Sequence, residues 1–257
     1  MNFIEQHVDE LSSMKKYPSK IFYEGNLELL KSKKISIVGT RKPSKYTKQM
    51  VQILSQKLSS NGICVVSGGA MGVDAVAHVG AKSSNTIAVL PCGINIKYPT
   101  VNKNLLTSIE QNGLLLSQFE AGFKATPWSF VVRNELVVAL GDVLVVAEAD
   151  LKSGSMRSVE FALKMNKEIF VLPHRLGESE ATQELLEQKK AKAIYNIDGF
   201  VEYISGNKLH VKNMDEFEKF CSTSPTYDEV LAKFPQRVFE AELNGEIEVK
   251  NTKVFLV

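Results

Sequence analysis

Short apolar runs alternate with amphipathic helical patterns along the first 205 residues of the chain. Ile35–Val38 is one such run, and the helical pattern that follows it ends near Asn61-Gly62. Short continuous apolar runs are typical of strands that are buried on both faces of a parallel sheet. The pattern predicts an α/β fold, an extended Rossmann-like, doubly wound and mostly parallel sheet. The other expected strands are 63–66, 86–90, 114–117, 143–147, 169–172 and 193–195.

The alternation ends at about residue 206, and this change suggests four parts of the chain. Residues 1–20 carry apolar residues at helical spacing and predict an N-terminal helical cap, while 21–206 form the Rossmann-like domain. The polar stretch 207–225 is expected to be a linker. Two helical patterns and a hairpin pattern follow in 226–257, which predicts a small winged-helix-like module.

Two glycine-containing turns are central to the functional prediction. Ile35–Arg41 and Val65–Asp74 each run from a strand through such a turn toward a helix. Glycine lets the backbone approach a ligand closely, and a helix start presents unpaired N–H groups. Because the carboxyl ends of parallel strands meet at one edge of a sheet, the two turns predict one anion-binding crevice. Residues 88–95 supply no acid for a dinucleotide ribose and the chain has no P-loop pattern, which disfavours NAD, FAD and P-loop nucleotides.

The charged residues favour a strand with several phosphates over a small ligand. The chain has 31 Lys+Arg against 29 Asp+Glu, a net charge of +2, so any nucleic-acid surface must be local. Arg41, Lys124, Arg133 and Lys152 all fall at expected carboxyl ends of strands or in the loops beyond them. Separate cations around one crevice suit successive phosphates.

An aromatic segment strengthens this interpretation. Residues 118–130 show no regular pattern and are expected to form a long loop with Phe123, Trp128 and Phe130. Exposed rings between basic residues stack single-stranded bases, although rings in such a loop also pack into a core.

The sequence gives little support to catalysis, metal binding or membrane insertion. The four histidines share no metal-binding spacing, no C-x-x-C is present, and His78 is expected to pack within a helix. Glu148 and Asp150 end a strand and are expected to orient basic side chains rather than transfer protons. No run approaches a membrane span, and the mixed acidic N-terminus is no signal peptide. Three separated cysteines indicate reduced thiols, so we expect a cytoplasmic protein. Together with the missing motifs, the sequence leads us to expect no catalytic residues, no metal and no cofactor.

At these motifs the chain resembles the DNA-processing protein A family, DprA or Smf, and the match covers roughly residues 30–205. The motifs that carry the resemblance are Ile-Val-Gly-Thr-Arg (37–41), Val-Ser-Gly-Gly-Ala-Met-Gly-Val-Asp-Ala-Val-Ala-His (66–78), Thr-Ile-Ala-Val-Leu (86–90) with Tyr98-Pro99, Phe130 with Arg133-Asn134, and Ser153-Gly154-Ser155.

The resemblance implies that the chain binds single-stranded DNA during natural transformation, protects incoming strands and helps to load the RecA recombinase. It also implies a homodimer that acts without a cofactor. The DNA-binding residues that the resemblance implies are Arg41, Ser67, Gly68, Gly69, Phe130, Arg133, Asn134, Lys152, Ser153, Gly154 and Ser155, to which position alone adds Lys124.

The chain departs from the family pattern at two positions. Glu135 stands where the family often has Arg, and its carboxylate is expected to repel phosphate or to pair with Arg133. Met71 stands where the family typically has Arg inside the second glycine motif, which removes another cation.

Two other function classes stay open at this point. One is a Rossmann-fold enzyme resembling nucleotide phosphoribohydrolases, whose P-G-G-x-G-T motif and catalytic Glu have only a faint echo in Ser155–Glu160. The other is an adaptor that contacts a recombinase through the C-terminal tail.

Overall fold

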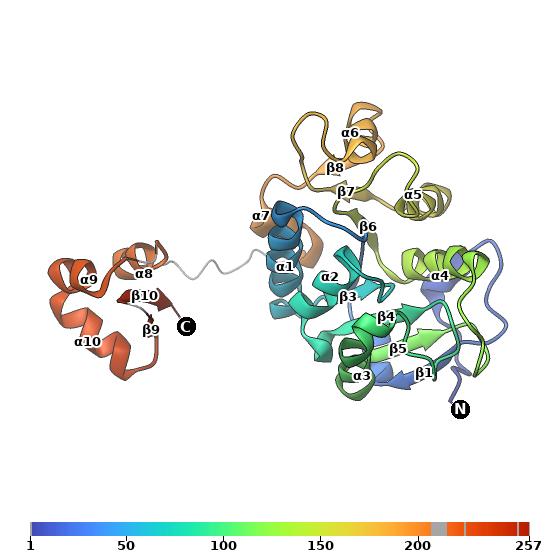
Figure 1. The fold of residues 1–257 in the computed structure, drawn as a ribbon, viewed down its shortest axis with the longest axis horizontal. Coiled ribbons are helices and arrows are strands. Elements are labelled where there is room, and N and C mark those ends of the chain that lie inside the picture. The colour runs from blue at the N-terminus through green and yellow to red at the C-terminus, as the bar shows by residue number, and fades with distance from the viewer. Residues whose placement is uncertain (1, 207–214, 224, 251, 257) are drawn as a thin grey trace. The chain divides into compact units, whose positions relative to one another are not determined.

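In the computed structural model, which describes residues 2–206, 215–223, 225–250 and 252–256, an eight-stranded sheet forms the centre of the first unit, Met1–Asn207 (Figure 1). The strand order is β1-β5-β4-β3-β2-β6-β7-β8. Every pairing is parallel except that of β1 with β5, which confirms the mostly parallel, doubly wound sheet. The strands are β1 Phe22–Gly25, β2 Lys34–Val38, β3 Cys64–Ser67, β4 Thr86–Leu90, β5 Leu114–Ser117, β6 Val143–Val146, β7 Ile169–Val171 and β8 Lys192–Ala193.

The order of the strands reverses between β2 and β6. From β2 the chain builds outward through β3, β4 and β5, and it then returns to add β6 beside β2, with Ile35 opposite Val143. The crossovers on the two sides of this point diverge, so a crevice opens beyond the carboxyl ends of β2 and β6. The residues of the central strands β2, β3, β4 and β6 are all buried, as their apolar sequences predict.

Helices cover both faces of the sheet. Helix α1 packs against α2 and α7, and α4 packs against α5 and the 3-10 helix η1 (Figure 1). The bounds are α1 Lys45–Ser60, α2 Val73–Ala81, α3 Lys103–Asn112, α4 Pro127–Leu140, α5 Ser155–Lys164, α6 Glu180–Glu187 and α7 Ile197–Ser205, with η1 Asp9–Ser13, η2 Leu27–Lys31, η3 Ser83–Asn85 and η4 Thr100–Asn102.

The prediction of one helix over residues 1–20 is wrong. Within residues 2–20, the part of this segment that the structure describes, only η1 is helical, and Phe3 instead forms an antiparallel bridge with Phe22 at the outer edge of β1. Val8 and Leu11 are buried against the core all the same. The apolar spacing therefore identified the buried side chains but not the backbone that presents them. Strand β1, which this segment covers, was not predicted.

The aromatic segment is also more regular than expected, because α4 begins at Pro127. Thr126 and Ser129 form a capping box, in which the side-chain oxygen of each residue accepts the backbone N–H of the other. Pro127 occupies the first helical turn. Trp128 and Phe130 therefore lie on a helix, and the irregular loop ends at residue 126.

The second unit, Lys208–Val257, has a small core of its own. Its elements are α8 Glu216–Cys221, α9 Tyr227–Lys233, α10 Pro235–Leu243 and an antiparallel hairpin of β9 Ile247–Lys250 and β10 Lys253–Leu256. The helices and hairpin agree with a winged-helix-like module. Phe217 and Cys221 of α8 are buried in this core, so the linker predicted over 207–225 is wrong in its second half, and 207–214 lie outside the described residues.

A capping box between Asp215 and Glu218 begins α8, and this start signal lies within the polar stretch that reads as a linker. Among the helices of the described residues, none is both long and apolar enough to span a bilayer.

Candidate nucleic-acid interface

A trough of about 510 Å³ lies at the point where the strand order reverses. The segments that follow β2, β3 and β6 form its walls, and one face of α4 completes it. A smaller hollow continues it toward Met71, Tyr98 and Pro99. The trough is lined by Val38, Gly39, Thr40, Arg41, Lys42, Gly68, Ala70, Asp74, Phe130, Arg133, Asn134, Val137, Glu148, Asp150, Ser153, Gly154, Ser155 and Ser158.

Phe130 is the aromatic centre of the trough. The Arg41 guanidinium carbon lies 5.4 Å from the centre of its ring and that of Arg133 lies 5.8 Å away. Tyr98 meets the same ring edge-on at 5.9 Å between centroids. Arg41 is exposed, whereas Arg133 is only 5% exposed. The trough thus places an exposed guanidinium beside a half-buried ring, a combination that suits single-stranded bases and phosphates.

Arg133 is engaged within the protein. Its Nη1 lies 3.6 Å from Oδ2 of Asp74, and the same oxygen accepts the backbone N–H groups of Gly68 and Ala70 at 3.2 and 3.3 Å. Burial raises the pKa of the Asp74 carboxyl, and the Arg133 charge and these amides counteract the rise. The carboxylate thus holds the glycine turn. The amide of Gly68, a predicted site residue, is therefore already occupied, as is that of Ala70.

The glycines of this turn are required by close packing. A Cβ at Gly68 would stand 1.2 Å from Arg133 Nη1, so a side chain there would displace the buried guanidinium. Gly72 has a φ of +80°, and a Cβ there would stand 2.4 Å from the Thr40 carbonyl oxygen. The turn therefore brings the loops after β2 and β3 into contact at the floor of the trough.

The turn at 153–155 supplies donors to the opposite wall. Ser153 Oγ is buried without a hydrogen-bond partner in the described residues, and Gly154 and Ser155 stand at the start of α5. First-turn N–H groups have no acceptor inside their helix. The Asn134 amide, 3.5 Å from the Gly154 carbonyl, connects α4 to this turn. A helix start with a buried unpaired hydroxyl suits a phosphate.

Four predicted site residues do not line the trough. Ser67 is buried, and its hydroxyl donates to the Ile37 carbonyl at 2.6 Å. Lys124 and Lys152 are exposed, but neither belongs to the residues that line the trough. Gly69 is buried within the glycine turn. The structure therefore brings together Arg41, Gly68, Phe130, Arg133, Asn134 and the 153–155 turn.

The carboxylates near the trough are largely committed to structural contacts. Glu148 accepts the Ser44 amide at 3.0 Å; burial alone would raise its pKa, but hydrogen bonds from Thr47 and Ser44 lower it. Glu160, at the end of the faint enzyme motif, pairs with Arg157 at 3.0 Å. Asp150 is exposed at the rim. The described residues contain no cluster of metal ligands.

Of the two alternatives for Glu135, pairing with Arg133 is wrong, and repulsion of phosphate stays a prediction. The Glu135 carboxylate accepts the backbone N–H of Lys15 at 3.1 Å, which ties α4 to the N-terminal segment. The ion-pair partner of Arg133 is Asp74. The sequence analysis assigns no role to Asp74, although an acid in the first turn of α2, six residues after Gly68, is a signal for such a contact.

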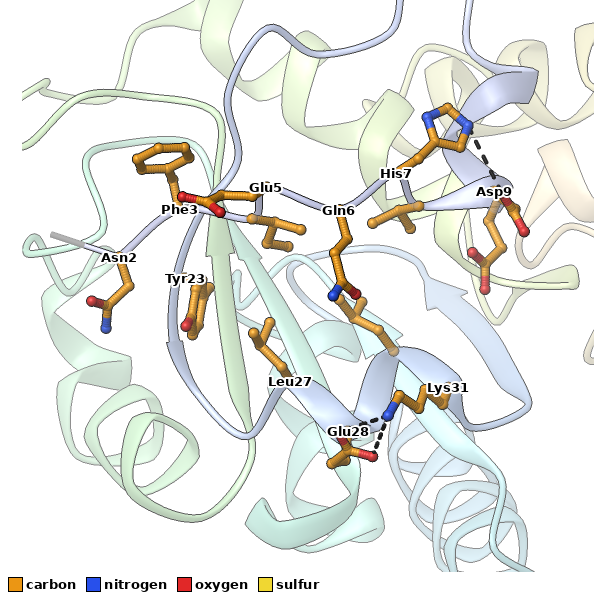
Figure 2. Close-up of a pocket in the computed structure, with 14 residues that line it drawn as sticks. Asn2, Phe3, Glu5, Gln6, His7, Asp9, Tyr23, Leu27, Glu28 and Lys31 are labelled. Carbon is orange, nitrogen blue, oxygen red and sulfur yellow. Dashed lines mark hydrogen bonds and ion pairs between the residues drawn. The ribbon is translucent and has the colours of Figure 1, made fainter.

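A larger hollow of about 840 Å³, here called the N-terminal groove, lies between the N-terminal segment and the β1–η2 region (Figure 2). Glu5, Asp9 and Glu28 line it, and its Lys31 is paired with Glu28 at 2.8 Å. Figure 2 shows these side chains along the rim of the groove. Since uncompensated carboxylates repel phosphate, size alone does not identify a nucleic-acid site.

Comparison with known proteins shows which family and which structures the chain is similar to. The family model "DNA recombination-mediator protein A" matches residues 4–205. The chain is 34% identical over 183 residues to "DNA processing protein DprA" of Streptococcus pneumoniae and 33% identical over 214 residues to that of Bacillus subtilis. These matches cover 70% and 82% of this chain, and 64% and 70% of the two relatives. The chain also covers 50% of "Protein Smf" of Escherichia coli, at 34% identity.

Two solved structures share the fold. A structure of DNA processing protein A from Helicobacter pylori, described for its single-stranded DNA binding mode, is 43% identical with a TM-score of 0.77, covering 79% of this chain and 94% of that one. The X-ray structure of DprA from Streptococcus pneumoniae is 34% identical with a TM-score of 0.69, covering 76% and 69%.

Proposed function

Because the chain belongs to the DNA recombination-mediator protein A family, we propose that it binds single-stranded DNA in the trough, without turnover chemistry. The observation that carries the proposal is the placement of Phe130 between Arg41 and Arg133, opposite the start of α5. A ring of this kind stacks any base, so binding is expected to be tolerant of sequence.

Each trough residue has a defined task in this proposal. The exposed Arg41 guanidinium forks onto a phosphate, and the N–H groups at 154–155 take a second one. Phe130 stacks a base. Arg133 is a positioning residue, since its ion pair with Asp74 holds the glycine turn and its guanidinium supports the Phe130 ring. Lys152 extends the cationic rim beside the turn.

The wider role that we propose follows from the family. The chain protects incoming strands in the cytoplasm during natural transformation, acts as a homodimer and helps to load the RecA recombinase. The second unit has its own core, so truncation at the unit boundary separates the roles. A chain that ends at residue 207 is expected to retain binding of DNA; parallel measurement of DNA and RecA binding tells whether the second unit contacts RecA.

Binding in the trough is tested by fluorescence anisotropy with labelled oligothymidylate. Arg41→Ala is expected to weaken binding about tenfold, because a charge-assisted phosphate contact is lost. Lys164→Ala is the matched control, since Lys164 is the exposed last residue of α5 and does not line the trough. Equal affinities of the two variants would contradict the proposal, as would release of free base from nucleoside monophosphates.

A further inference from the structure

A further hollow, of about 470 Å³, lies beside the trough at the same edge of the sheet. Ser44 and Tyr46 line it from the start of α1, and the loop after β7 contributes Pro173, His174, Arg175 and Glu178. We name these six residues the α1–β7 pocket. None of them belongs to the motifs discussed above, so the pocket is independent of the features that identified the trough.

The α1–β7 pocket and the trough share a wall. Glu148, which lines the trough, accepts the backbone N–H of Ser44, which lines the pocket, at 3.0 Å. His174 Nε2 lies 2.8 Å from the carbonyl oxygen of Ala147, the residue before Glu148. Lys42 lines the trough and Ser44 the pocket, so only Pro43 separates them along the chain. A flexible strand that left the trough past Lys42 would therefore reach the pocket next.

Tyr46 offers the pocket a fixed aromatic surface. Its side chain is 42% exposed, and its ring meets the His174 ring edge-on, at 5.5 Å between centroids and 82° between planes. The hydrogen bond of His174 to the Ala147 carbonyl holds the histidine ring in place. An exposed ring that a neighbour orients in this way is a platform for a base, because little side-chain freedom remains to be lost on stacking.

The surroundings of the pocket carry more free cations than carboxylates. Arg175 is exposed, and so are Lys42 and Lys45 on the approach from the trough. No ion pair involves these three side chains among the residues that the structure describes. Glu178 is the opposing charge in the pocket. The remaining excess of positive charge favours a phosphate between Arg175 and the lysines.

We infer that the α1–β7 pocket is a second nucleotide subsite, which stacks a base on Tyr46 and binds a phosphate at Arg175. The inference rests on the proposed function, since the ligand is the continuation of the strand that the trough holds. The path runs across the start of α1, from the loop after β2 to the loop after β7.

A length series separates the two subsites. Affinity is measured by anisotropy for oligothymidylates from three to twenty nucleotides. For the wild-type chain, affinity is expected to rise when the strand becomes long enough to reach the α1–β7 pocket. Tyr46→Ala is expected to remove this gain and to weaken long strands about tenfold, while short strands bind as before. Arg41→Ala weakens every length.

Conservative variants and salt dependence distinguish contact from folding defects. Tyr46→Phe keeps the ring and is expected to keep the gain with length. Arg175→Ala is expected to flatten the logarithmic salt dependence for long strands by about 0.7 and to leave short strands unchanged. Lys164→Ala serves as the charge control, and thermal denaturation of each variant checks folding.

The outcomes decide between the two proposals. If Tyr46→Ala and Arg175→Ala show the same affinities as the wild-type chain at every length, while Arg41→Ala weakens binding, the proposal of a second subsite is wrong and binding in the trough is supported. If the wild-type chain binds no oligonucleotide, both fail. Photo-crosslinking of a long strand that carries 5-iodouracil gives a second readout. A crosslink to Tyr46 or His174 supports the path, and crosslinks confined to the trough overturn it.

Discussion

The trough and the N-terminal groove are two hollows of the same unit with opposite character. The groove is larger, about 840 Å³ against about 510 Å³, but its carboxylates outnumber its cations and its Lys31 is already paired. The trough is smaller, its buried carboxylate Asp74 is neutralised by Arg133, and Arg41 is exposed beside an aromatic ring. The difference shows that the state of the charges, more than the volume, distinguishes a site for a polyanion.

The origin of the difference is topological. The trough lies at the carboxyl ends of β2, β3 and β6, where glycine turns and helix starts meet and the strand order reverses. The groove lies along the outer edge of β1, next to a segment with an irregular backbone. The first place concentrates N–H donors, and the second presents the acidic side chains of a surface segment.

Gly68→Ala should have the largest effect of the substitutions considered, because it disturbs the floor of the trough and leaves the N-terminal groove intact. The new Cβ would overlap the Arg133 guanidinium, so the ion pair with Asp74 must open or the turn must move. We expect a loss of about 1–3 kcal/mol in the free energy of unfolding, measured in urea, together with loss of oligonucleotide binding. Gly199→Ala, in α7 with no atom closer than 3.7 Å to the new Cβ, is the control and should be neutral or stabilising. Equal effects would show that the floor of the trough is not tightly packed.

Phe130→Ala should weaken single-stranded DNA binding by about 1–3 kcal/mol if one base stacks on the ring. Trp128→Ala is the matched control on the same helix. Trp128 is 62% exposed, packs edge-on against Phe119 and does not line the trough. Titration by anisotropy compares the two variants, and a larger loss for Trp128→Ala would move the site away from Phe130.

The buried side chain of His78 predicts that the stability of the fold depends on pH. His78 lies on α2, and burial first, then the Arg133 charge, lowers its pKa to about 3. It stays neutral in the folded chain while the unfolded chain binds a proton below about pH 6.5. The contribution of neutral His78 to the free energy of unfolding is therefore fully present above pH 6.5. It decreases by about 1.4 kcal/mol per pH unit as the pH falls from 6.5 toward 3.

His78 Nδ1 lies 2.7 Å from the Thr86 hydroxyl oxygen, and His78→Asn keeps a donor for that hydroxyl. The substitution should remove the histidine's contribution to the pH dependence of the free energy of unfolding. Urea denaturation between pH 7 and pH 5 measures both chains. If the free energy of unfolding changed equally with pH in the wild-type chain and in His78→Asn, the histidine would be protonated in the folded state as well.

Removal of one carboxylate from each hollow should give the smallest changes in DNA affinity, and only the change at the trough should be detectable. Asp150→Asn takes a carboxylate from the rim of the trough and should strengthen oligonucleotide binding about two- to threefold. Glu5→Gln, in the groove, should leave affinity unchanged, since DNA in the trough does not contact it. If Glu5→Gln strengthened binding as much, the groove would have to be counted as part of the DNA path.

The sequence predicts the sheet well and the site only in part. Apolar runs such as Ile35–Val38 identify strands because both faces of a central parallel strand are buried. The start of α4 was missed because the Thr126–Ser129 capping box lies in a segment that lacks apolar periodicity. The burial of Arg133 could not be predicted, since its partner Asp74 lies on another helix and only the fold brings the two together.

The salt dependence of binding tests the central claim most directly. Affinity for a fixed oligothymidylate is measured between low and high salt for the wild-type chain, Arg41→Ala and Lys164→Ala. If Arg41 neutralises a phosphate in the trough, the logarithmic slope for Arg41→Ala should be shallower by about 0.7, with Lys164→Ala unchanged. A slope for Arg41→Ala that equals the wild-type slope would contradict the account.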